Sequence, residues 1–169
     1  ISQIDVLATI AEDFALLAVV REAEIISVDL NNVVNNAAHL YGEESVLVES
    51  HAHKIQVEGD ASRLMRAFNN LIANALDSMY DAKSNEPIKV EITEDEDFAI
   101  VKVIDTGIGI PPEKLERIFE PRFTTKTHGL GLGLAMVKSI VEQSKGEVSV
   151  LSTEGKGATF TIKLLKARK

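Results

Sequence analysis

The stretch VKVIDTGIG, residues 101–109, joins a strand pattern to an acidic, glycine-rich turn. Apolar and polar residues alternate over residues 98–104, which predicts a strand with one buried face. Residues 88–93 alternate in the same way, and the polar residues 94–97 predict a turn that pairs the two strands. The pattern therefore predicts an antiparallel strand pair with Asp105 at the end of its second strand.

Asp105, Gly107 and Gly109 suit the recognition of adenine. An ionised Asp only accepts hydrogen bonds, and adenine offers an exocyclic amine where guanine presents a carbonyl. Asp105 would therefore favour adenine and repel guanine. The two glycines would let the backbone approach a base closely. Taken alone, an ordinary strand-end turn explains these residues equally well, because Asp and Gly both favour turns.

Asn70 and Asn74 lie four residues apart on a helix that is predicted from an Asp60 N-cap to about Tyr80. Their neighbours on this helix are largely apolar, and two carboxamides in such a setting are costly unless paired. An Asn carbonyl is a hard oxygen ligand that suits Mg²⁺ already held by phosphates. Taken alone, a helix-packing hydrogen bond or simple exposure is the better explanation.

Residues 129–134 read GLGLGL and run from a loop into a helix predicted over about residues 131–144. Glycines spaced by two can present backbone amides to phosphate. The helix N-terminus adds free N–H donors and a favourable dipole. A flexible hinge is the alternative, but the helix begins inside the run, which favours phosphate binding.

Residues 121–130 predict a loop between Phe119 and the glycine run. Lys126 in this loop could meet a terminal phosphate as a point charge. The alternative is a solvated loop flanked by two core-packed residues, Phe119 and Phe123. Its position before the glycines favours a lid. Each of the four blocks is weak alone, but their order within about half a domain's length indicates a magnesium-bound adenine nucleotide.

The remaining patterns surround these blocks with further helices and strands. A helix is expected to open at residues 28–29, with Asp29 as its N-cap, and to run to about Leu40. Residues 111–112, both Pro, are expected to start a short helix that ends near Phe119, and Gly146 is the expected C-cap of the 131–144 helix. Further strands are expected at residues 46–49, 54–57, 147–152 and 158–165. The predicted fold is an α/β (α+β) two-layer sandwich, with a mixed, mostly antiparallel sheet covered by helices on one face.

Composition limits the function classes. The 169 residues are 45% hydrophobic, enough for a real core, and contain no cysteine, which excludes disulfides and thiolate metal sites. The net charge is −8 and the basic residues form no broad cluster, so no nucleic-acid partner is expected. No apolar run approaches the roughly 20 residues of a membrane helix. A cytoplasmic location without membrane contact by this stretch is therefore expected.

Residues 1–24 predict an amphipathic helix. Apolar residues at spacings of three and four form a heptad-like seam, which includes Ile4, Leu7, Ala11 and Phe14. The seam suits either packing on the same domain or a bundle with another helix or chain, and both alternatives stay open. The chain starts at Ile1 in the middle of the pattern, so it is expected to be a piece of a longer protein.

Together these motifs make the chain resemble the catalytic and ATP-binding domain of bacterial sensor histidine kinases, within the wider gyrase, chaperone, kinase and MutL superfamily. Residues 70–75 resemble the N box of that family, 105–109 its G1 box, 118–126 its F box and 129–134 its G2 box. The resemblance covers about residues 30–166 and implies the Bergerat ATP-binding fold.

The resemblance also implies roles for individual residues. Asn74 would be the Mg²⁺ ligand with Asn70 in support, and Asp105 would bind the adenine of ATP. Asn70 and Lys126 would act in catalysis. The nucleotide pocket would be formed by Asn70, Asn74, Asp105, Gly107, Gly109, Lys126, Gly129, Leu130, Gly131, Leu132, Gly133 and Leu134. ATP and Mg²⁺ are the implied cofactors, and residues 121–130 the ATP lid.

By the same resemblance, residues 1–26 are the C-terminal part of the second dimerisation helix and residues 27–169 the catalytic domain. None of the histidines, His39, His51, His53 and His128, lies in the sequence context of a phosphoacceptor, so the acceptor is expected outside this chain. The implied partners are the protein's own dimerisation domain in a homodimer and a response regulator. The parent protein is compatible with an inner-membrane sensor.

Three residues depart from the family pattern. Arg122 replaces a common Phe of the F box, Asp77 stands where many relatives carry a Lys, and Ala158 stands where many carry a Thr near adenine. The implied activity is transfer of the ATP γ-phosphoryl to a protein histidine. One alternative is an ATP-hydrolysing gyrase, chaperone or MutL-type module, but such relatives place a general-base Glu where this chain has Asn70. The other is a serine kinase of the anti-sigma-factor type, against which the N-terminal helix argues.

Overall fold

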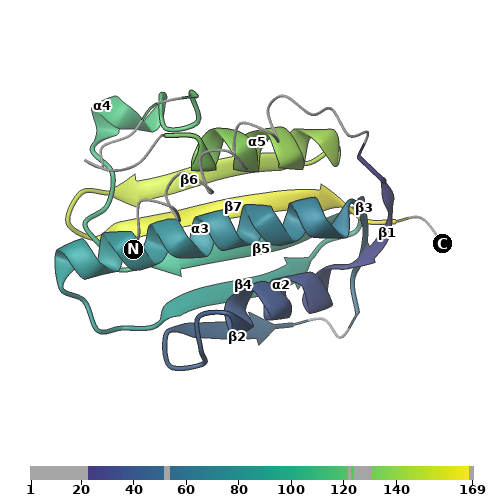
Figure 1. Ribbon diagram of the computed structural model, residues 1–169, viewed down its shortest axis with the longest axis horizontal. Helices are drawn as coiled ribbons and strands as arrows, with labels where there is room; N and C mark the ends of the chain where they lie inside the picture. The colour runs from purple at the N-terminus through teal and green to yellow at the C-terminus, as the bar shows by residue number, and fades with distance from the viewer. Residues whose placement is uncertain (1–22, 52–53, 122, 124–130, 168–169) are drawn as a thin grey trace, which may run out of the picture.

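The computed structural model describes residues 23–51, 54–121, 123 and 131–167. Strands and helices alternate irregularly along this part of the chain (Figure 1). In chain order they are β1 (Ile26–Asp29), α2 (Leu30–His39), β2 (Val46–Ser50), β3 (Gln56–Gly59), α3 (Ala61–Ala82), β4 (Ile88–Glu94), β5 (Phe98–Asp105), α4 (Pro112–Leu115), α5 (Gly133–Gln143), β6 (Glu147–Thr153) and β7 (Gly157–Leu165).

The main sheet has five strands in the order β2-β4-β5-β7-β6. The β4–β5 and β6–β7 pairs are antiparallel, as predicted, and β5 also pairs antiparallel with β7. The β2–β4 pair is parallel. A mostly antiparallel, mixed sheet is therefore confirmed.

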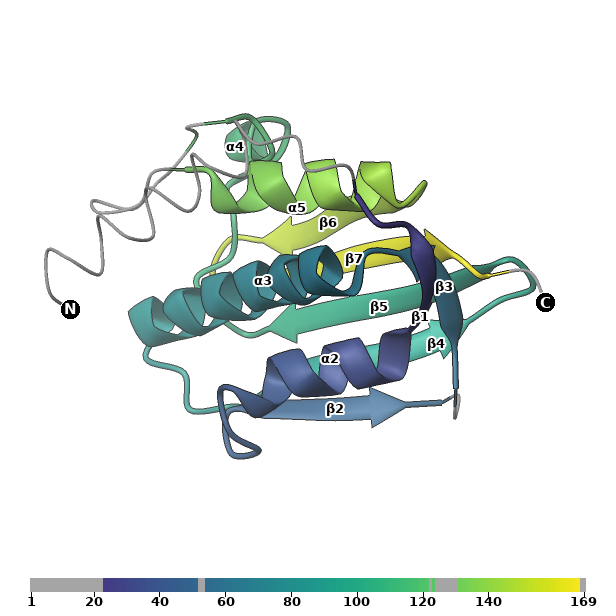
Figure 2. The same cartoon turned by 45° about the vertical axis from the view of Figure 1, so that its right-hand side comes forward.

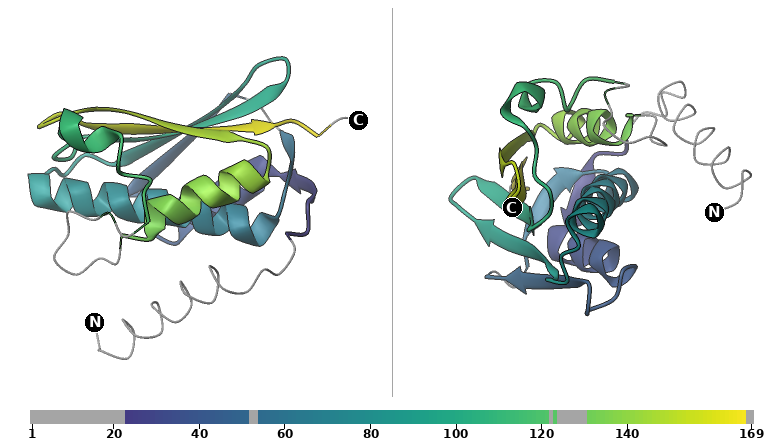
Figure 3. Two further views of the ribbon diagram at one scale, coloured as in Figure 1. Left: turned by 90° about the horizontal axis from the view of Figure 1, so that it is seen from above. Right: turned by 90° about the vertical axis from the view of Figure 1, so that its left-hand side faces the viewer.

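Helices α2, α3 and α5 cover one face of this sheet (Figures 1 and 3). The strand residues on that face are buried, because side chains alternate between the two faces of a strand. Helix α3 supplies the largest buried set of the three, including Leu64, Phe68 and Ile72. Figure 2 shows α3 and α5 side by side, with α3 in front of β5 and β7 and α5 next to β6. The two-layer sandwich with helices on one face is confirmed.

A second, two-stranded sheet was not foreseen. Strand β1 pairs antiparallel with β3, with Val28 opposite Val57, so residues 28–29 end a strand rather than open a helix. The helix begins one residue later, at Leu30, and Asp29 is its N-cap: its Oδ1 accepts a hydrogen bond of 3.1 Å from the Asn32 N–H. The short pattern of β1 gave no periodicity of its own, and its pairing partner lies about 30 residues away in the sequence.

Helix ends differ from the predictions in two places. The short helix α4 ends at Leu115, not near Phe119. After α5 the left-handed residue is Lys145, with φ 55°, and Gly146 follows it. The Gly146 N–H bonds the Val141 carbonyl in a Schellman motif. Gly146 is required for a different reason, since a Cβ there would overlap the Lys163 carbonyl oxygen.

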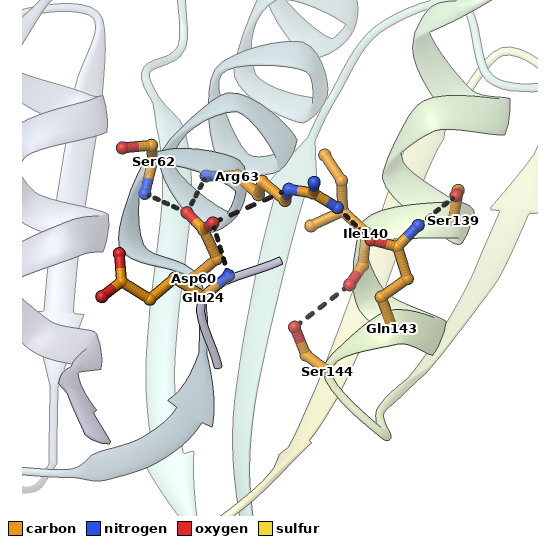
Figure 4. A network of polar contacts seen from close by, with 8 residues as sticks. All are labelled: Glu24, Asp60, Ser62, Arg63, Ser139, Ile140, Gln143 and Ser144. Atoms are coloured by element: carbon orange, nitrogen blue, oxygen red, sulfur yellow. Dashed lines mark hydrogen bonds and ion pairs between the residues drawn. The ribbon is translucent and has the colours of Figure 1, made fainter. Parts of the chain in front are cut away.

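Asp60 caps α3, as predicted, and α3 extends two residues beyond Tyr80. The Asp60 carboxylate accepts from the N–H groups of Ser62 and Arg63 and from the Glu24 N–H (Figure 4). Arg63 also bonds Gln143 near the end of α5. These contacts hold Glu24, just before β1, against the first turn of α3, and they join the first turn of α3 to the last turn of α5.

The predicted helix over residues 1–24 lies outside the described residues except for residues 23 and 24, which are not helical, so its predicted end is wrong. Within the part of the chain that is described, no helix is both long enough and apolar enough to cross a membrane.

Candidate nucleotide-binding site

Asp105 ends β5 and is only 5% exposed. Its Oδ1 accepts a hydrogen bond of 2.8 Å from the Gly107 N–H and one of 3.4 Å from the Ser78 hydroxyl. Burial raises the pKa of Asp105, whereas hydrogen bonds from the backbone of Gly107 and Ala158 and from Ser78 oppose that rise. The result is a buried acceptor whose orientation is set by several donors.

The turn after Asp105 is packed against α3 and against the β6–β7 turn. A Cβ on Gly107 would overlap Ser78, and one on Gly109, which has φ 69°, would overlap the Thr153 carbonyl. The Ile108 N–H donates to the Ser78 carbonyl at 3.2 Å, and the Ile108 carbonyl accepts from the Gly155 N–H at 2.7 Å. Both glycines thus let the backbone pack closely on protein neighbours, and their predicted close approach to a base stays a prediction.

Asn70 and Asn74 face the start of α5. A Cβ on Gly133 would lie 3.3 Å from Asn70 Oδ1 and 4.0 Å from Asn74 Nδ2. Helix α3 and α5 thus bring two of the sequence blocks, 60 residues apart, into direct contact. The prediction that these blocks share one site is consistent with this placement.

The N-terminus of α5 has the features of a phosphate-binding turn. Gly131 has φ 66°, a left-handed conformation that favours glycine. Leu132 is the N-cap, and no described side chain caps the helix there. The side chain of Leu132 is buried, and that of Leu134 packs on the core. These two leucines therefore offer a ligand chiefly their backbone N–H groups.

Three predicted site residues lie outside the described residues, namely Lys126, Gly129 and Leu130. Arg122 and His128 also lie outside them. Of the two aromatics that flank the lid, Phe119 packs edge-on against Phe160, with ring centroids 6.4 Å apart. Phe123 packs on the core with the Arg117 guanidinium 4.9 Å above its ring. Both aromatics therefore pack on the core, and whether they flank a lid or a solvated loop stays a prediction, because residues 124–130 lie outside the described residues.

Sequence reasoning missed three residues that support Asp105. Ser78 donates to its carboxylate, and Gly157, with φ 91°, leaves room for its backbone, because a Cβ there would overlap the Asp105 carbonyl. Ser152 accepts from the Ile110 N–H and donates to the Gly157 carbonyl, each at 2.8 Å. Only Ser78 had a usable signal: it follows Asn74 by four residues and so lies on the same helix face.

An open depression of about 400 Å³ lies where β5 and β6 end and β7 begins. Asp105, Thr106 and Ala158 are among the residues that line it, whereas Asn70 and Asn74 are not. The lining also includes Ile104, Leu151 and Thr159, which alternate with the buried or partly buried residues of their strands and so lie on the sheet face away from the helices. The depression therefore does not outline the candidate site, whose asparagine pair lies between α3 and α5.

A mixed sheet under three helices, with a buried Asp at a strand end and an asparagine pair facing a glycine-rich helix start, defines an ATP-binding sandwich domain. Residues 59–168 match the family described as Histidine kinase-, DNA gyrase B-, and HSP90-like ATPase. The chain belongs to this family.

Curated relatives are sensor kinases. The chain is 37% identical over 156 residues to the sensor histidine kinase ZraS of Salmonella typhimurium, covering 87% of this chain and 33% of the relative. It is 39% identical over 144 residues to sporulation kinase A of Bacillus subtilis, covering 78% and 23%. The chain therefore spans a third or less of the length of these relatives.

Solved structures show the same fold. The catalytic domain of the histidine kinase ThkA superposes with a TM-score of 0.74 at 29% identity, covering 85% of this chain and 96% of that one. The mycobacterial sensor histidine kinase MprB gives a TM-score of 0.73 at 27% identity, covering 86% and 99%. The predicted resemblance to histidine kinase catalytic domains is confirmed.

Proposed function

We propose that this chain is the catalytic part of a sensor histidine kinase, which binds Mg-ATP and donates the γ-phosphoryl group to a histidine on a dimerisation domain. The main support for the proposal is the position of Asn70, which lies on α3 against the start of α5. A carboxamide is not a useful general base near neutral pH, so this position does not activate water. Family membership and the sensor kinases among the relatives support the same reading.

Each end of ATP has a suitable partner in the chain. The Asp105 carboxylate would accept a hydrogen bond from the adenine amine and would repel the guanine carbonyl. The N–H groups in the first turn of α5 would bind phosphate oxygens, helped by the helix dipole. Lys126 would add a positive charge at the terminal phosphate.

The carboxamides of Asn70 and Asn74 fit Mg²⁺. Both offer neutral, hard oxygen ligands, and the described residues contain no group of three or more His, Cys, Asp or Glu side chains that could hold a metal by themselves. Mg²⁺ would thus be held by Asn74, with Asn70 in support, together with ATP phosphates. When bound, the ion neutralises phosphate charge.

The reaction needs little covalent chemistry from the chain. The bond between the γ-phosphorus and the β–γ bridging oxygen breaks, a bond from a histidine nitrogen to that phosphorus forms, and ADP leaves with the electron pair. The residues named above position the phosphates and stabilise their charge. The nucleophile comes from outside this chain.

The domain division and partners follow from the same proposal. The resemblance predicts that residues 1–26 belong to a dimerisation helix and residues 27–169 to the catalytic domain. Because Ile26 of β1 pairs with Gly59 of β3, we propose that the catalytic domain begins at Ile26. The partners would be that dimerisation domain in a homodimer and a response regulator. A cytoplasmic location for this part is proposed because the reaction consumes ATP.

The test combines this chain with the dimerisation hairpin of its parent protein and γ-labelled ATP. We expect Mg²⁺-dependent label on the hairpin that is acid-labile and alkali-stable, as a phosphohistidine is. Acid-stable label would indicate a serine or threonine kinase instead. Release of inorganic phosphate without any labelled protein would indicate an ATPase and contradict the proposal.

A further inference from the structure

Two donors on α3 converge on a single sulfur atom of α5. Arg66 Nε lies 3.0 Å from Met136 Sδ, and Asn70 Nδ2 lies 3.7 Å from the same atom. Met136 is only 6% exposed, so water competes little for its sulfur. A thioether is a weak acceptor, but it is the described partner of the Asn70 amide group.

This contact determines which end of the Asn70 carboxamide faces the candidate site. A carboxamide has a donor end and an acceptor end, and rotating it by half a turn exchanges them. With Nδ2 directed at Met136, the carbonyl Oδ1 faces Gly133 at the start of α5, 3.3 Å from the position of a Cβ on that glycine. The reversed amide would present N–H groups there, and since Asn74 already directs its Nδ2 toward Gly133, Asn70 supplies the oxygen of the pair at this point.

We infer that Met136 is a positioning residue, which holds the Asn70 carboxamide with its oxygen toward the bound Mg²⁺. The identity of that ligand rests on the proposed function, whereas the orientation of Asn70 does not. If Met136 served packing alone, an apolar side chain of similar volume would replace it without effect on nucleotide binding.

The test uses the 169-residue chain and three substitutions. Met136→Leu keeps volume and removes the acceptor, whereas Met136→Gln keeps chain length and supplies an amide oxygen. Met79→Leu is the matched control, because Met79 on α3 is similarly buried, 4% exposed against 6%, whereas Asn70 donates to Met136. Calorimetry would give the Kd for ATP with Mg²⁺, and urea unfolding the stability of each variant without nucleotide.

We expect Met136→Leu to weaken Mg-ATP binding about threefold to fivefold, the effect of one weak hydrogen bond. Met136→Gln should stay within about twofold of the unchanged chain, and Met79→Leu should have no effect on Kd. In an Asn70→Ala background, Met136→Leu should add nothing further, because its effect passes through Asn70. Unchanged binding in Met136→Leu, or an equal loss in the Asn70→Ala background, would overturn the inference.

A ligand-free measurement separates this inference from the proposed function. The side-chain amide resonances of Asn70 should shift in Met136→Leu and stay unchanged in Met79→Leu. If the unchanged chain fails to bind Mg-ATP, the proposed function fails, and these resonances still decide the role of Met136. Unshifted resonances in Met136→Leu would overturn that role whatever the chain binds.

Discussion

Asp105 combines burial with charge, and the two have opposite effects on its pKa. Burial favours the neutral acid, while the donors Gly107, Ala158 and Ser78 favour the carboxylate, and the net effect is a raised pKa. A ligand that donates a hydrogen bond needs the charged form. Asp105 therefore lowers the folding stability of the empty domain but can accept a hydrogen bond from a bound ligand, as expected of a binding group.

Asp105→Asn should therefore have opposite effects on the two properties: it should stabilise the empty domain at neutral pH relative to the unchanged chain, and it should abolish ATP binding. A carboxyl whose pKa is higher in the folded than in the unfolded chain holds its proton more tightly when folded, so folding stability falls as pH rises from the ordinary value of 3.8 through the raised one. Asn does not titrate. We measure the free energy of unfolding of both proteins in urea from pH 4 to 7. The value for Asp105→Asn minus the value for the unchanged chain should increase as pH rises.

The same variant should lose ATP binding in calorimetry at every pH in this range. Parallel pH profiles for the two proteins would show that the Asp105 pKa is not raised by folding. Normal ATP affinity in Asp105→Asn would contradict its role toward adenine.

Gly107 offers a second test at the residue scale, because it is needed for space rather than for a left-handed backbone. A Cβ there would overlap both the side chain and the backbone of Ser78, whereas Gly155, with φ 76°, has nothing within 4 Å of such an atom. Gly107→Ala should cost about 1–3 kcal/mol of unfolding free energy through overpacking. Gly155→Ala should cost about 1 kcal/mol through backbone strain alone.

Ser78→Ala should recover part of the loss in Gly107→Ala, since it removes the hydroxyl that the new methyl group meets. Chemical denaturation of the two single variants and the double variant measures this. A double variant that is no more stable than Gly107→Ala would show that the backbone of Ser78, not its hydroxyl, limits the space.

At the scale of elements, α3 connects the two ends of the helical layer. Its N-terminal turn binds the entering segment through Asp60, and Arg63 reaches Gln143 at the end of α5 (Figure 4). Its middle carries Asn70 and Asn74 to the start of α5, and its C-terminal half supplies Ser78 to Asp105. One helix therefore aligns both halves of the candidate site.

Asp60 tests the first of these contacts. Asp60→Ala removes the cap and the acceptor of the Glu24 N–H, and should cost about 1–2 kcal/mol of unfolding free energy. Asp60→Asn keeps the capping oxygen for Ser62 and Arg63 but replaces Oδ2, which accepts from the Glu24 N–H and pairs with Arg63 at 3.7 Å, so it should cost less than Asp60→Ala, about 1 kcal/mol or below. Thermal unfolding of both variants checks the order; an equal loss would show that the contacts of Oδ2, not the cap, matter.

At the scale of the whole molecule, the candidate site is built from segments that are separated in the sequence. Residues of α3, β5, α5 and the β6–β7 turn meet at one end of the sandwich. A ligand that joins them should stabilise the folded chain as a unit, because it binds the folded form and not the unfolded one.

Mg-ATP at about 100 times its Kd should raise the free energy of unfolding by about 2.7 kcal/mol, and the unfolding midpoint with it. GTP at the same concentration should have a much smaller effect, since Asp105 disfavours guanine. Differential scanning fluorimetry with each nucleotide, with and without Mg²⁺, measures this. Equal stabilisation by ATP and GTP would contradict the adenine role of Asp105.

Local features of the sequence determined much of this protein. The caps Asp29 and Asp60, the alternating strands and the Asp105 turn depend on neighbours within a few residues, so their patterns are visible in the chain itself. Tertiary structure decided what depends on distant partners. The pairing of β1 with β3, the closeness of Gly133 to Asn70 and the support of Asp105 by Ser78 each join segments far apart in sequence. Space and hydrogen bonds between such segments exist only after the sheet and its helices have packed, which is why no local pattern reveals them.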